Sequence, residues 1–214
     1  MVDDHPSMIE GYKIILSYNP FGYEVETTAV YNCENAYEII RKKRTVKSFN
    51  IFLLDYSLPP FEKKNLSNGE DLAILIRKKN PEAKVVMLTS HVETILLYDI
   101  IKNVRPNGLL VKSDFTADEL LVAFDKVICG GVYYSETVKK IMANLSSKVL
   151  YLDKKNRQIV SYLAQGLSTK SIPELLDISL SAVEKRKVVI KNYFDIKKGN
   201  DEDILRAARE QGFV

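Results

Sequence analysis

Hydrophobic and polar residues alternate along the first 130 positions in two repeating patterns. Short apolar runs bounded by polar or turn residues are typical of buried strands, and apolar residues three and four positions apart are typical of amphipathic helices. The strand pattern occurs at residues 23–30, 49–54, 84–88 and 108–111, and the helix pattern at residues 7–17, 33–43, 72–79, 93–103 and 117–129. Their alternation predicts parallel βαβ units, with helices on both faces of one doubly wound sheet.

The C-terminal part of the chain shows the helical pattern alone. Residues 154–164 are amphipathic, and Gly166 is placed to end that helix in the left-handed conformation. Ser171 and Glu174 fit a capping box, with Pro173 in the first turn, where a missing N–H is tolerated. Two further helices are predicted at residues 182–194 and 202–210, the second of which ends at Gly212. This order predicts a small all-α domain.

Connecting segments define the domain limits. Residues 60–69 are polar and longer than a usual connection between a strand and a helix, so we expect a surface excursion there. Gly130 and Gly131 end the last helix of the α/β domain, and a helix is expected over residues 135–145. We therefore predict a first domain at 1–130, a linker at 131–150 and a helical domain at 151–214, with the boundary near residues 144–151.

Composition narrows the class of protein. The 214 residues are 46% hydrophobic and 28% charged, which is ordinary for a globular protein and excludes disordered and fibrous classes. Cys33 and Cys129 lack metal-ligand spacing and are too few for a disulfide framework, so we expect reduced thiols. Because membrane-length apolar runs and signal-peptide features are missing, we expect a soluble, cytoplasmic protein without a membrane partner.

The positive charge is concentrated at one end of the chain. Net charge is +3; residues 1–150 carry 19 basic and 19 acidic side chains, whereas residues 151–214 carry 12 and 9. The excess therefore lies in the predicted helical domain. It permits a nucleic-acid partner there, although a charged run is usually only a solvated face.

Carboxylates follow two of the predicted strands. Asp55 ends a run of four apolar residues, and Asp3 and Asp4 follow Met1 and Val2, which are the remainder of a first strand. In the flavodoxin-like strand order 2-1-3-4-5 these strands are neighbours, and ligands bind beyond their carboxyl ends. Carboxylates this close need a dication, and Mg²⁺ suits such oxygen ligands. Taken alone, an aspartate after a strand is more often a turn or helix-cap residue.

Two further strand ends are directed at the same crevice. Thr89 and Lys112 each follow a short apolar run. Either residue alone would be unremarkable, because threonine is a good strand residue and a strand-end lysine usually extends to solvent. Beside the carboxylates, however, a hydroxyl and an ammonium would complement the oxygens of a phosphoryl group. His5 and His91 are interpreted as rim residues, because magnesium prefers oxygen ligands.

These residues together resemble the receiver domain of two-component response regulators. The matching motifs are Asp3-Asp4, Asp55 in Leu-Leu-Asp-Tyr-Ser-Leu-Pro, Thr89 in Met-Leu-Thr-Ser-His and Lys112 in Leu-Val-Lys-Ser. The four motifs have the order and spacing of the family, and the resemblance covers residues 1–130. It implies a flavodoxin-like receiver fold.

The resemblance also implies a role for each matching residue. Asp55 accepts a phosphoryl group from a sensor histidine kinase, Thr89 is the switch hydroxyl and Lys112 pairs with the phosphate. The implied Mg²⁺ ligands are Asp4, Asp55 and the backbone carbonyl of Ser57, with Asp3 assisting.

The helical domain resembles the LuxR-type helix-turn-helix of NarL-like regulators over residues 150–214. The matching segments are Leu-Ala-Gln-Gly-Leu-Ser-Thr-Lys at 163–170 and Ile-Ser-Leu-Ser-Ala-Val-Glu-Lys-Arg-Lys at 178–187. A recognition helix turns apolar residues inward, here Val183, Val189, Ile190 and Phe194, and long polar donors outward to double-stranded DNA. The predicted DNA contacts are Lys170, Ser181, Lys185, Arg186, Lys187 and Lys191. A helical bundle with a solvated basic face is the alternative.

The chain departs from the family pattern at several positions. Only Met1 and Val2 precede the acidic pair, where family members carry a complete apolar strand, so we expect a truncated N-terminus. Leu109 stands where an aromatic residue usually lies three positions before the lysine, so the usual hydroxyl-to-aromatic relay cannot operate. Ala182 and Glu184 replace frequent Thr and Lys residues, so no operator sequence is inferred. In addition, Pro173 is expected to shorten the helix before the recognition helix.

The leading hypothesis is a phosphorylation-controlled transcription regulator that dimerises when active. One alternative is a regulator that binds DNA independently of phosphorylation, with a structural acidic pocket. The rival enzyme class is an aspartate-nucleophile phosphatase of the haloacid-dehalogenase type, which also uses an aspartate after an apolar strand and magnesium. That class needs a second acid two residues after the nucleophile, and this chain has Ser57 there. The sequence therefore favours a regulator over an enzyme.

Overall fold

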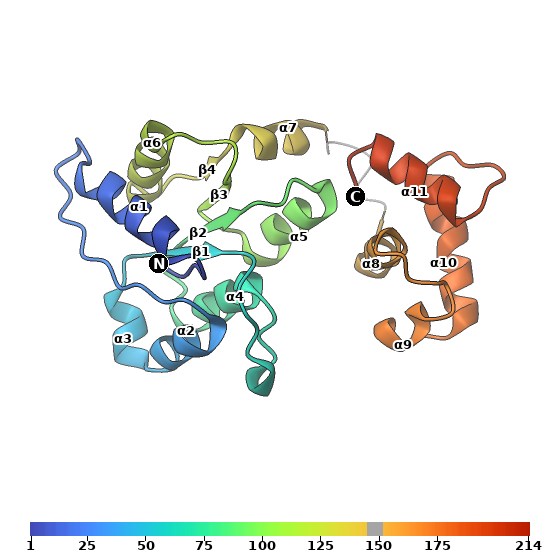
Figure 1. The fold of residues 1–214 in the computed structure, drawn as a ribbon, viewed down its shortest axis with the longest axis horizontal. Helices are drawn as coiled ribbons and strands as arrows, with labels where there is room; N and C mark the ends of the chain where they lie inside the picture. Colours follow the sequence, from blue (N-terminus) through green and yellow to red (C-terminus); the bar gives the residue numbers. More distant parts are fainter. Residues whose placement is uncertain (145–151) are drawn as a thin grey trace. The chain divides into compact units, whose positions relative to one another are not determined.

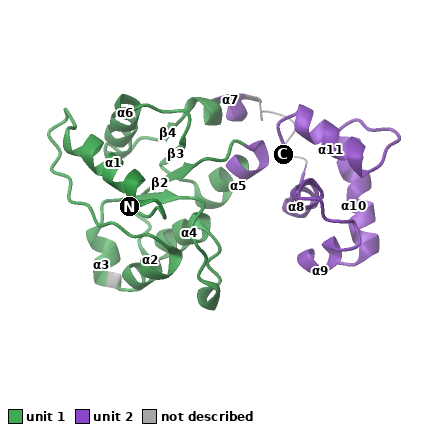
Figure 2. Ribbon diagram, viewed as in Figure 1, with its two compact units in different colours: residues 1–92, 98–139 green, residues 93–97, 140–214 purple. Residues whose placement is uncertain are grey.

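The computed structural model describes residues 1–144 and 152–214, and the chain divides into two compact units. The first unit comprises residues 1–92 and 98–139, and the second comprises residues 93–97 and 140–214 (Figure 2). The predicted boundary near residues 144–151 falls almost wholly outside the described residues. The domain limits of the sequence analysis therefore stay predictions.

A parallel sheet forms the centre of the first unit (Figure 1). Its strands are, in spatial order, β1 (Ile51–Asp55), β2 (Lys84–Thr89), β3 (Gly108–Val111) and β4 (Tyr133–Tyr134). Asp55 aligns with Leu88, and Thr89 aligns with Val111. Because every pair is parallel, the carboxyl ends of β1, β2 and β3 lie at the same edge of the sheet.

Helices cover both faces of the sheet, as the alternating pattern predicted (Figure 1). On one face α1 (Pro6–Ser17) packs beside α6 (Ala117–Ile128). The group that includes α2 (Cys33–Ile40), α3 (Lys43–Ser48) and α4 (Gly69–Lys79) covers the other. The remaining helices before the undescribed segment are α5 (Thr94–Val104) and α7 (Glu136–Asn144). The predicted flavodoxin-like α/β fold is confirmed.

The first two strands of the predicted order are reduced to single bridges. Val2 bridges Val30 on one side and Leu54 of β1 on the other, both in parallel orientation. The spatial order therefore agrees with 2-1-3-4-5, but the prediction of a regular strand over residues 23–30 is wrong. A strand needs a partner of similar length, and the neighbouring segment here is Met1 and Val2.

One further local prediction is wrong, and one short strand was not predicted. The helix predicted at residues 33–43 ends at Ile40 and is followed by the separate helix α3. The short strand β4 was not predicted, because two tyrosines are too few to show a period of two. The predicted surface excursion is confirmed: residues 60, 62–65 and 67 are exposed, and the one-turn helix η1 (Glu62–Lys64) and a bridge between Phe61 and Leu66 order this segment.

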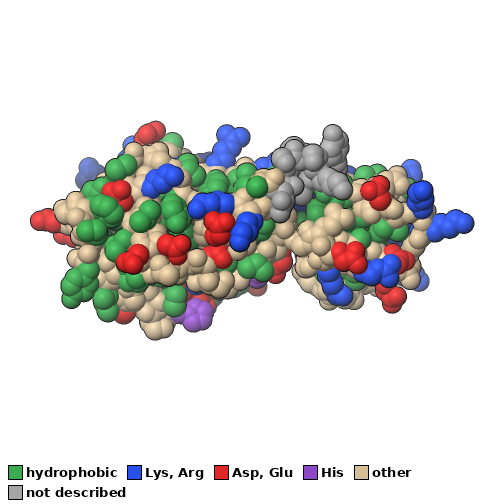
Figure 3. Space-filling view, turned by 90° about the horizontal axis from the view of Figure 1, so that it is seen from above, with side chains coloured by type: hydrophobic (Ala, Val, Ile, Leu, Met, Phe, Trp, Pro, Cys, Tyr) green, Lys and Arg blue, Asp and Glu red, His purple; other side chains and the backbone are tan. Residues whose placement is uncertain are grey.

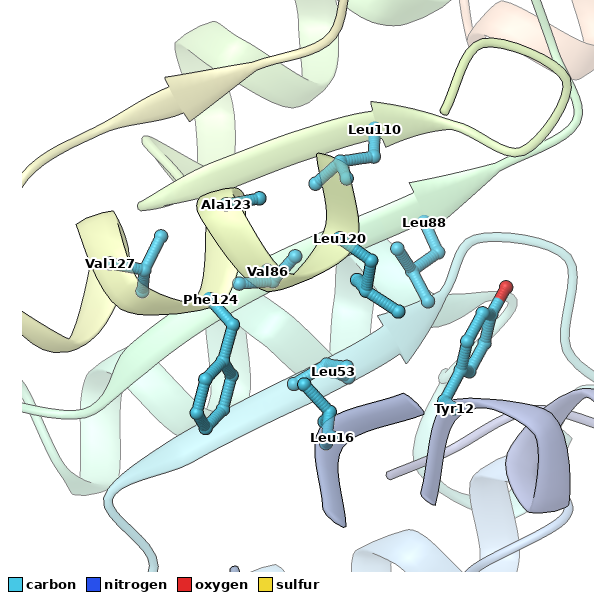
Figure 4. Packing of buried hydrophobic residues seen from close by; sticks show 10 residues of the cluster. All are labelled: Tyr12, Leu16, Leu53, Val86, Leu88, Leu110, Leu120, Ala123, Phe124 and Val127. Carbon is cyan, nitrogen blue, oxygen red and sulfur yellow. The ribbon is translucent and has the colours of Figure 1, made fainter. Parts of the chain in front are cut away.

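A hydrophobic core joins α1 and α6 to the sheet (Figure 4). Its labelled members are Tyr12 and Leu16 of α1, Leu53 of β1, Val86 and Leu88 of β2, Leu110 of β3, and Leu120, Ala123, Phe124 and Val127 of α6. Burial of each large apolar side chain stabilises the fold by roughly 1.5–3 kcal/mol. This core holds the strands whose carboxyl ends carry the candidate site.

The second unit contains four helices after residue 152, as predicted: α8 (Lys154–Ala164), α9 (Ile172–Leu176), α10 (Leu180–Tyr193) and α11 (Asp201–Glu210). Three residues connect α9 to α10, which is typical of a helix-turn-helix, and Asp177 takes the left-handed conformation in that turn. Gly166 has a φ of 81° after α8, as expected for a residue that ends a helix.

One predicted cap in this unit is wrong. Ser171 precedes α9 but makes no side-chain cap, because its hydroxyl lies 2.9 Å from the hydroxyl of Ser168. Pro173 does lie in the first turn of α9, as predicted. Within residues 1–144 and 152–214, none of the helices combines the length and apolar character that crossing a membrane requires.

Candidate functional sites

Lys112 lies between two buried carboxylates at the carboxyl edge of the sheet. Its ammonium is 2.9 Å from Oδ1 of Asp55 and 2.8 Å from Oδ2 of Asp3. Backbone bonds fix the carboxylates: Asp55 N–H donates to the carbonyl of Val2, and Asp3 N–H donates to that of Val30. The structure therefore brings Asp3, Asp55 and Lys112 together as the sequence predicted, although Met1 and Val2 alone precede the acidic pair.

Burial determines the electrostatics of this cluster. Removal from water raises the pKa of Asp55, and the charges of Asp3 and Asp4 add to that rise, while Lys112 opposes it. Burial lowers the pKa of Lys112, but its hydrogen bonds to Asp3 and Asp55 outweigh that effect and raise the pKa overall. The lysine therefore stays charged and compensates two carboxylates that would otherwise repel each other.

Asp4 and Ser57 provide further oxygen atoms for a metal. Oδ1 of Asp4 is buried and accepts no hydrogen bond from the described residues, although Nδ1 of His5 lies 2.8 Å away. Among the described hydrogen bonds, none ends on the carbonyl of Ser57. Carboxylate and carbonyl oxygens are the ligands that Mg²⁺ prefers, so the atoms present fit the predicted metal.

Thr89 and its neighbours form another side of the site. Thr89 is fully buried; its hydroxyl accepts from His91 N–H at 3.0 Å, and its carbonyl accepts from Lys112 N–H at 2.7 Å. His91 also lies against Tyr56, with ring centroids 5.5 Å apart, and its Nε2 is 3.2 Å from the hydroxyl of Ser57. His91 thus contacts the last residue of β2 and two residues that follow β1, as expected for a rim residue.

Gly69 allows the backbone of Asp55 to lie against the start of α4. A Cβ atom at position 69 would come within 1.9 Å of the Asp55 carbonyl oxygen. Any side chain there would displace the end of β1, so this glycine is part of the geometry of the site.

Tyr12 and Leu109 also bear on the site. Tyr12 lies in α1, and its buried hydroxyl has no hydrogen-bond partner among the described residues. Burial raises its pKa to about 12, with Lys112 opposing and Asp3 adding to that effect. Leu109 is fully buried within β3, aligned with Met87 and Tyr134, and supplies no ring for an aromatic relay.

In the second unit, Lys187 does not lie on the outer face of α10, where it was predicted to contact DNA. Its side chain is buried; Nζ lies 2.7 Å from Oδ1 of Asp201 and donates to the Thr169 hydroxyl at 2.9 Å. The Thr169 hydroxyl in turn donates to Asp201. This network ties α10 to α11 and to the segment before α9, so Lys187 has a structural role.

Arg186, on the same helix, is only partly available for the predicted contact with DNA. Its Nη1 contacts both carboxylate oxygens of Asp153, at 2.8 and 2.6 Å, and Oδ1 of Asn156 at 2.9 Å. Burial raises the pKa of Asp153, but the hydrogen bond and charge of Arg186, together with backbone N–H donors of Asn156 and Lys155, outweigh it and lower the pKa overall. Arg186 therefore secures the N-cap of α8 in addition to any external contact.

The outer face of α10 differs from the prediction in its apolar residues. Val183 and Ile190 are buried as predicted, whereas Val189 is 48% exposed and the assignment of Val189 to the inner face is wrong. Apolar residues occur on both faces of this helix, so spacing alone could not separate them. The exposed positions of the helix are Leu180, Ser181, Glu184, Lys185, Val188, Val189 and Asn192. Lys170 is exposed before α9, and Lys191 is partly exposed.

Replacing Lys187 with Met is expected to destabilise the second unit by about 1–3 kcal/mol near neutral pH, because Asp201 and Thr169 lose a buried partner. Burial raises the pKa of Asp201, but Lys187 lowers it overall, below its ordinary value of 3.8. The ion pair thus stabilises the fold above about pH 4 and loses its contribution as pH falls through the lowered pKa. Thermal unfolding of Lys187→Met, followed by circular dichroism at several pH values, measures the loss of stability. Lys185→Met is the control at an exposed position. An equal loss in Lys187→Met at all pH values would contradict the role of the ion pair.

Residues 1–125 match the model of the response regulator receiver domain, and the chain belongs to this family. The oxygen regulatory protein NreC of Staphylococcus aureus is 26% identical over 209 residues, which cover 92% of this chain and 90% of that protein. A response regulator with a receiver and a helix-turn-helix, as predicted for the NarL/FixJ type, is therefore confirmed at the level of family and fold.

Solved structures of response regulators share the fold of the whole chain. The two-component response regulator RcsB in complex with DNA has a TM-score of 0.63 at 17% identity, covering 97% of this chain and 95% of that chain. RcsB from Salmonella enterica serovar Typhimurium, bound to promoter rprA with the phosphomimetic BeF₃⁻, has a TM-score of 0.63 at 18% identity, covering 97% and 96%. At these identities the comparison establishes the fold alone.

Proposed function

We propose that this chain is a cytoplasmic transcription regulator whose binding to DNA is controlled by phosphorylation of Asp55. The observation that carries the proposal is the placement of Lys112 between Asp3 and Asp55 at the carboxyl edge of the sheet. A buried acceptor carboxylate with an adjacent ammonium can take up a phosphoryl group whose charge the ammonium then neutralises.

The phosphoryl donor is a phosphohistidine of a sensor kinase. An Oδ atom of Asp55 attacks phosphorus, the P–N bond to histidine breaks, and a P–O bond to aspartate forms. Lys112 then pairs with the added phosphoryl oxygens, and the Thr89 hydroxyl is the switch group that turns to them. Asp4, Asp55 and the Ser57 carbonyl, with Asp3 assisting, would hold Mg²⁺, which would supply positive charge at this site.

DNA is bound through the outer face of α10 as the second helix of the helix-turn-helix. Lys185, Ser181 and Lys191 are the donors of this face, and Lys170 reaches phosphate from the segment before α9. Arg186 contributes only if it leaves Asp153, and Lys187 is excluded because it is buried. The solved complexes of the response regulator RcsB with DNA support this use of the fold.

The active form is a homodimer, and α1 with α6 offers a surface for it. Gly11 and Ile14 of α1 and Tyr18, which directly follows this helix, lie at helical spacing; Ile14 is 59% and Tyr18 80% exposed. Val122 of the adjacent α6 is 52% exposed. Figure 3 shows hydrophobic side chains of the first unit reaching the surface between charged ones. Exposed apolar groups of this kind favour association with a second copy.

Replacing Lys185 with Ala is expected to weaken binding to a duplex selected from random sequences by roughly 5–150-fold, because a base or phosphate contact of the recognition helix is lost. Fluorescence anisotropy at two salt concentrations measures this. The control is Lys78→Ala at an exposed position of α4 in the first unit, for which affinity should not change. Equal affinities for wild type and Lys185→Ala would contradict the proposed recognition face.

One observation favours a second candidate, a regulator that binds DNA without phosphorylation. Leu109 is fully buried and offers no ring for the usual relay from the Thr89 hydroxyl. In that case the wild type would bind its site equally with and without a phosphoryl group. The phosphatase alternative gains no such support, because Ser57 replaces the second acid and its hydroxyl faces His91; the relatives above are named as regulators.

A further inference from the structure

A network of buried and partly buried hydrogen bonds links the end of β3, beside the proposed phosphorylation site, to the start of α7. Ser135 directly precedes α7 and is 2% exposed. Its N–H donates to the carbonyl of Leu109 at 3.0 Å, and its hydroxyl accepts from the N–H of Val111 at 3.1 Å. Ser135 therefore continues the parallel ladder beyond β4, and its side chain pairs with the last residue of β3.

Asp114 connects this ladder to the first turn of α7. One carboxylate oxygen, Oδ2, accepts from the Ser135 hydroxyl at 2.9 Å and from Thr137 N–H at 2.6 Å. The other, Oδ1, accepts from the Thr137 hydroxyl at 2.8 Å. Asp114 thus caps the N-terminus of a helix from a different segment of the chain, where a negative charge is favourable.

Asp114 lies two residues after Lys112 in a tight turn. Asp114 N–H donates to the carbonyl of Val111 at 2.9 Å, and Lys112 N–H donates to that of Thr89. The ammonium of Lys112 bonds Asp3 and Asp55. Phosphorylation of Asp55 would replace the single negative charge of its carboxylate by the roughly 1.5–2 negative charges of a phosphoryl group, within reach of that ammonium. Any shift of the Lys112 backbone is transmitted to Asp114, because the turn between them is closed by hydrogen bonds.

We propose that Asp114 and Ser135 are positioning residues that couple the state of Asp55 to the N-terminus of α7. This inference rests on the proposed function and supplies a connection that Leu109 cannot make. In chain order α7 is the last described element before α8, so its first turn is where a change in the receiver domain enters the segment that leads to the DNA-binding helices. The coupling acts through a bistable cap: Asp114 either holds the Ser135 and Thr137 donors or releases them.

The test uses the full chain with Mg²⁺ and beryllofluoride as the phosphoryl mimic. The variants are Asp114→Asn, Ser135→Ala and the milder Thr137→Val, with Glu136→Gln as the control at the same helix start. In each, phosphate incorporation at Asp55 should stay within about twofold of wild type, while the gain in DNA affinity on adding beryllofluoride falls from the roughly 5–150-fold of a coupled system to under about twofold. A merely structural role would lower the melting temperature without removing the gain. Retention of the full gain in all three variants would overturn the inference.

Amide hydrogen exchange of α7 separates this inference from the proposed function. In wild type, beryllofluoride should change the protection of the Thr137 amide and its neighbours, and in Asp114→Asn it should not. If beryllofluoride changes the amide protection of α7 in wild type but not its affinity for DNA, the proposed function fails and the coupling stands. If DNA binding responds while α7 protection stays constant, the coupling is wrong and the proposed function stands. If Asp114→Asn does not fold, the same comparison is made with the milder variant Thr137→Val.

Discussion

Replacing Asp55 with Asn is expected to abolish phosphoryl incorporation. Wild type incubated with a small-molecule phosphoryl donor and Mg²⁺ should gain the mass of one phosphate, and Asp55→Asn should gain none. An asparagine amide at position 55 cannot form the acyl phosphate. The two neighbouring carboxylates stay paired, Asp3 with Lys112 and Asp4 with His5, so we do not expect them to replace Asp55 as the acceptor. Intact-protein mass spectrometry measures the shift.

Two controls accompany this measurement. Asp118→Asn removes an exposed carboxylate from the first turn of α6 and should be phosphorylated like wild type. Chelation of Mg²⁺ should slow incorporation strongly, because the charge that the metal supplies is then missing. A full phosphate shift in Asp55→Asn would remove Asp55 as the acceptor and transfer the role to another carboxylate.

Replacing Lys112 with Met is expected to lower the free energy of unfolding by about 3–5 kcal/mol, because two buried carboxylates lose the ammonium that bonds both. The side chains of Asp3 and Asp55 are 2% and 4% exposed, so solvent cannot compensate them. Urea unfolding followed by circular dichroism, with a chelator present, measures the loss. The expected order of stability is wild type, then Lys112→Met/Asp55→Asn, then Lys112→Met.

The loss in Lys112→Met should also depend on pH. Burial already raises the pKa of Asp55 above its ordinary value of 3.8, and removal of Lys112 raises it further. An acid whose pKa is raised in the folded state costs stability as pH increases through the interval between its unfolded and folded pKa values. Lys112→Met should therefore recover stability on acidification from neutral pH toward that interval. Lys126→Met, at an exposed position of α6, should show neither effect; an equal loss there would contradict the buried-pair explanation.

The order of strands and helices could be predicted from the sequence because period and length separate them clearly in this chain. Asp55, Thr89 and Lys112 were found in the same way: each directly follows an apolar run, and parallel strands bring their carboxyl ends to one edge. The missing strand at residues 23–30 could not be foreseen from its own residues. Its apolar alternation is real, but strand formation depends on a partner, and Val2 supplies a single bridge.

The recognition helix shows a different limit of sequence reasoning. Lys187 was assigned outward because lysine usually extends to solvent, yet Asp201 and Thr169, distant in sequence, provide a buried partner set for its ammonium. Val189 was assigned inward because of its apolar side chain, although Val183 and Ile190 already fill that face. The coupling residues Asp114 and Ser135 carried no motif at all, because their significance depends on contacts between β3, β4 and α7.

The central claim is that the phosphorylation state of Asp55 controls DNA affinity, and a four-way binding comparison tests it most directly. The affinity for one selected duplex is measured for wild type and Asp55→Asn, each with and without beryllofluoride and Mg²⁺, at fixed salt. We predict a gain of roughly 5–150-fold in wild type alone, with the other three affinities equal. Equal affinity in all four measurements would contradict the claim.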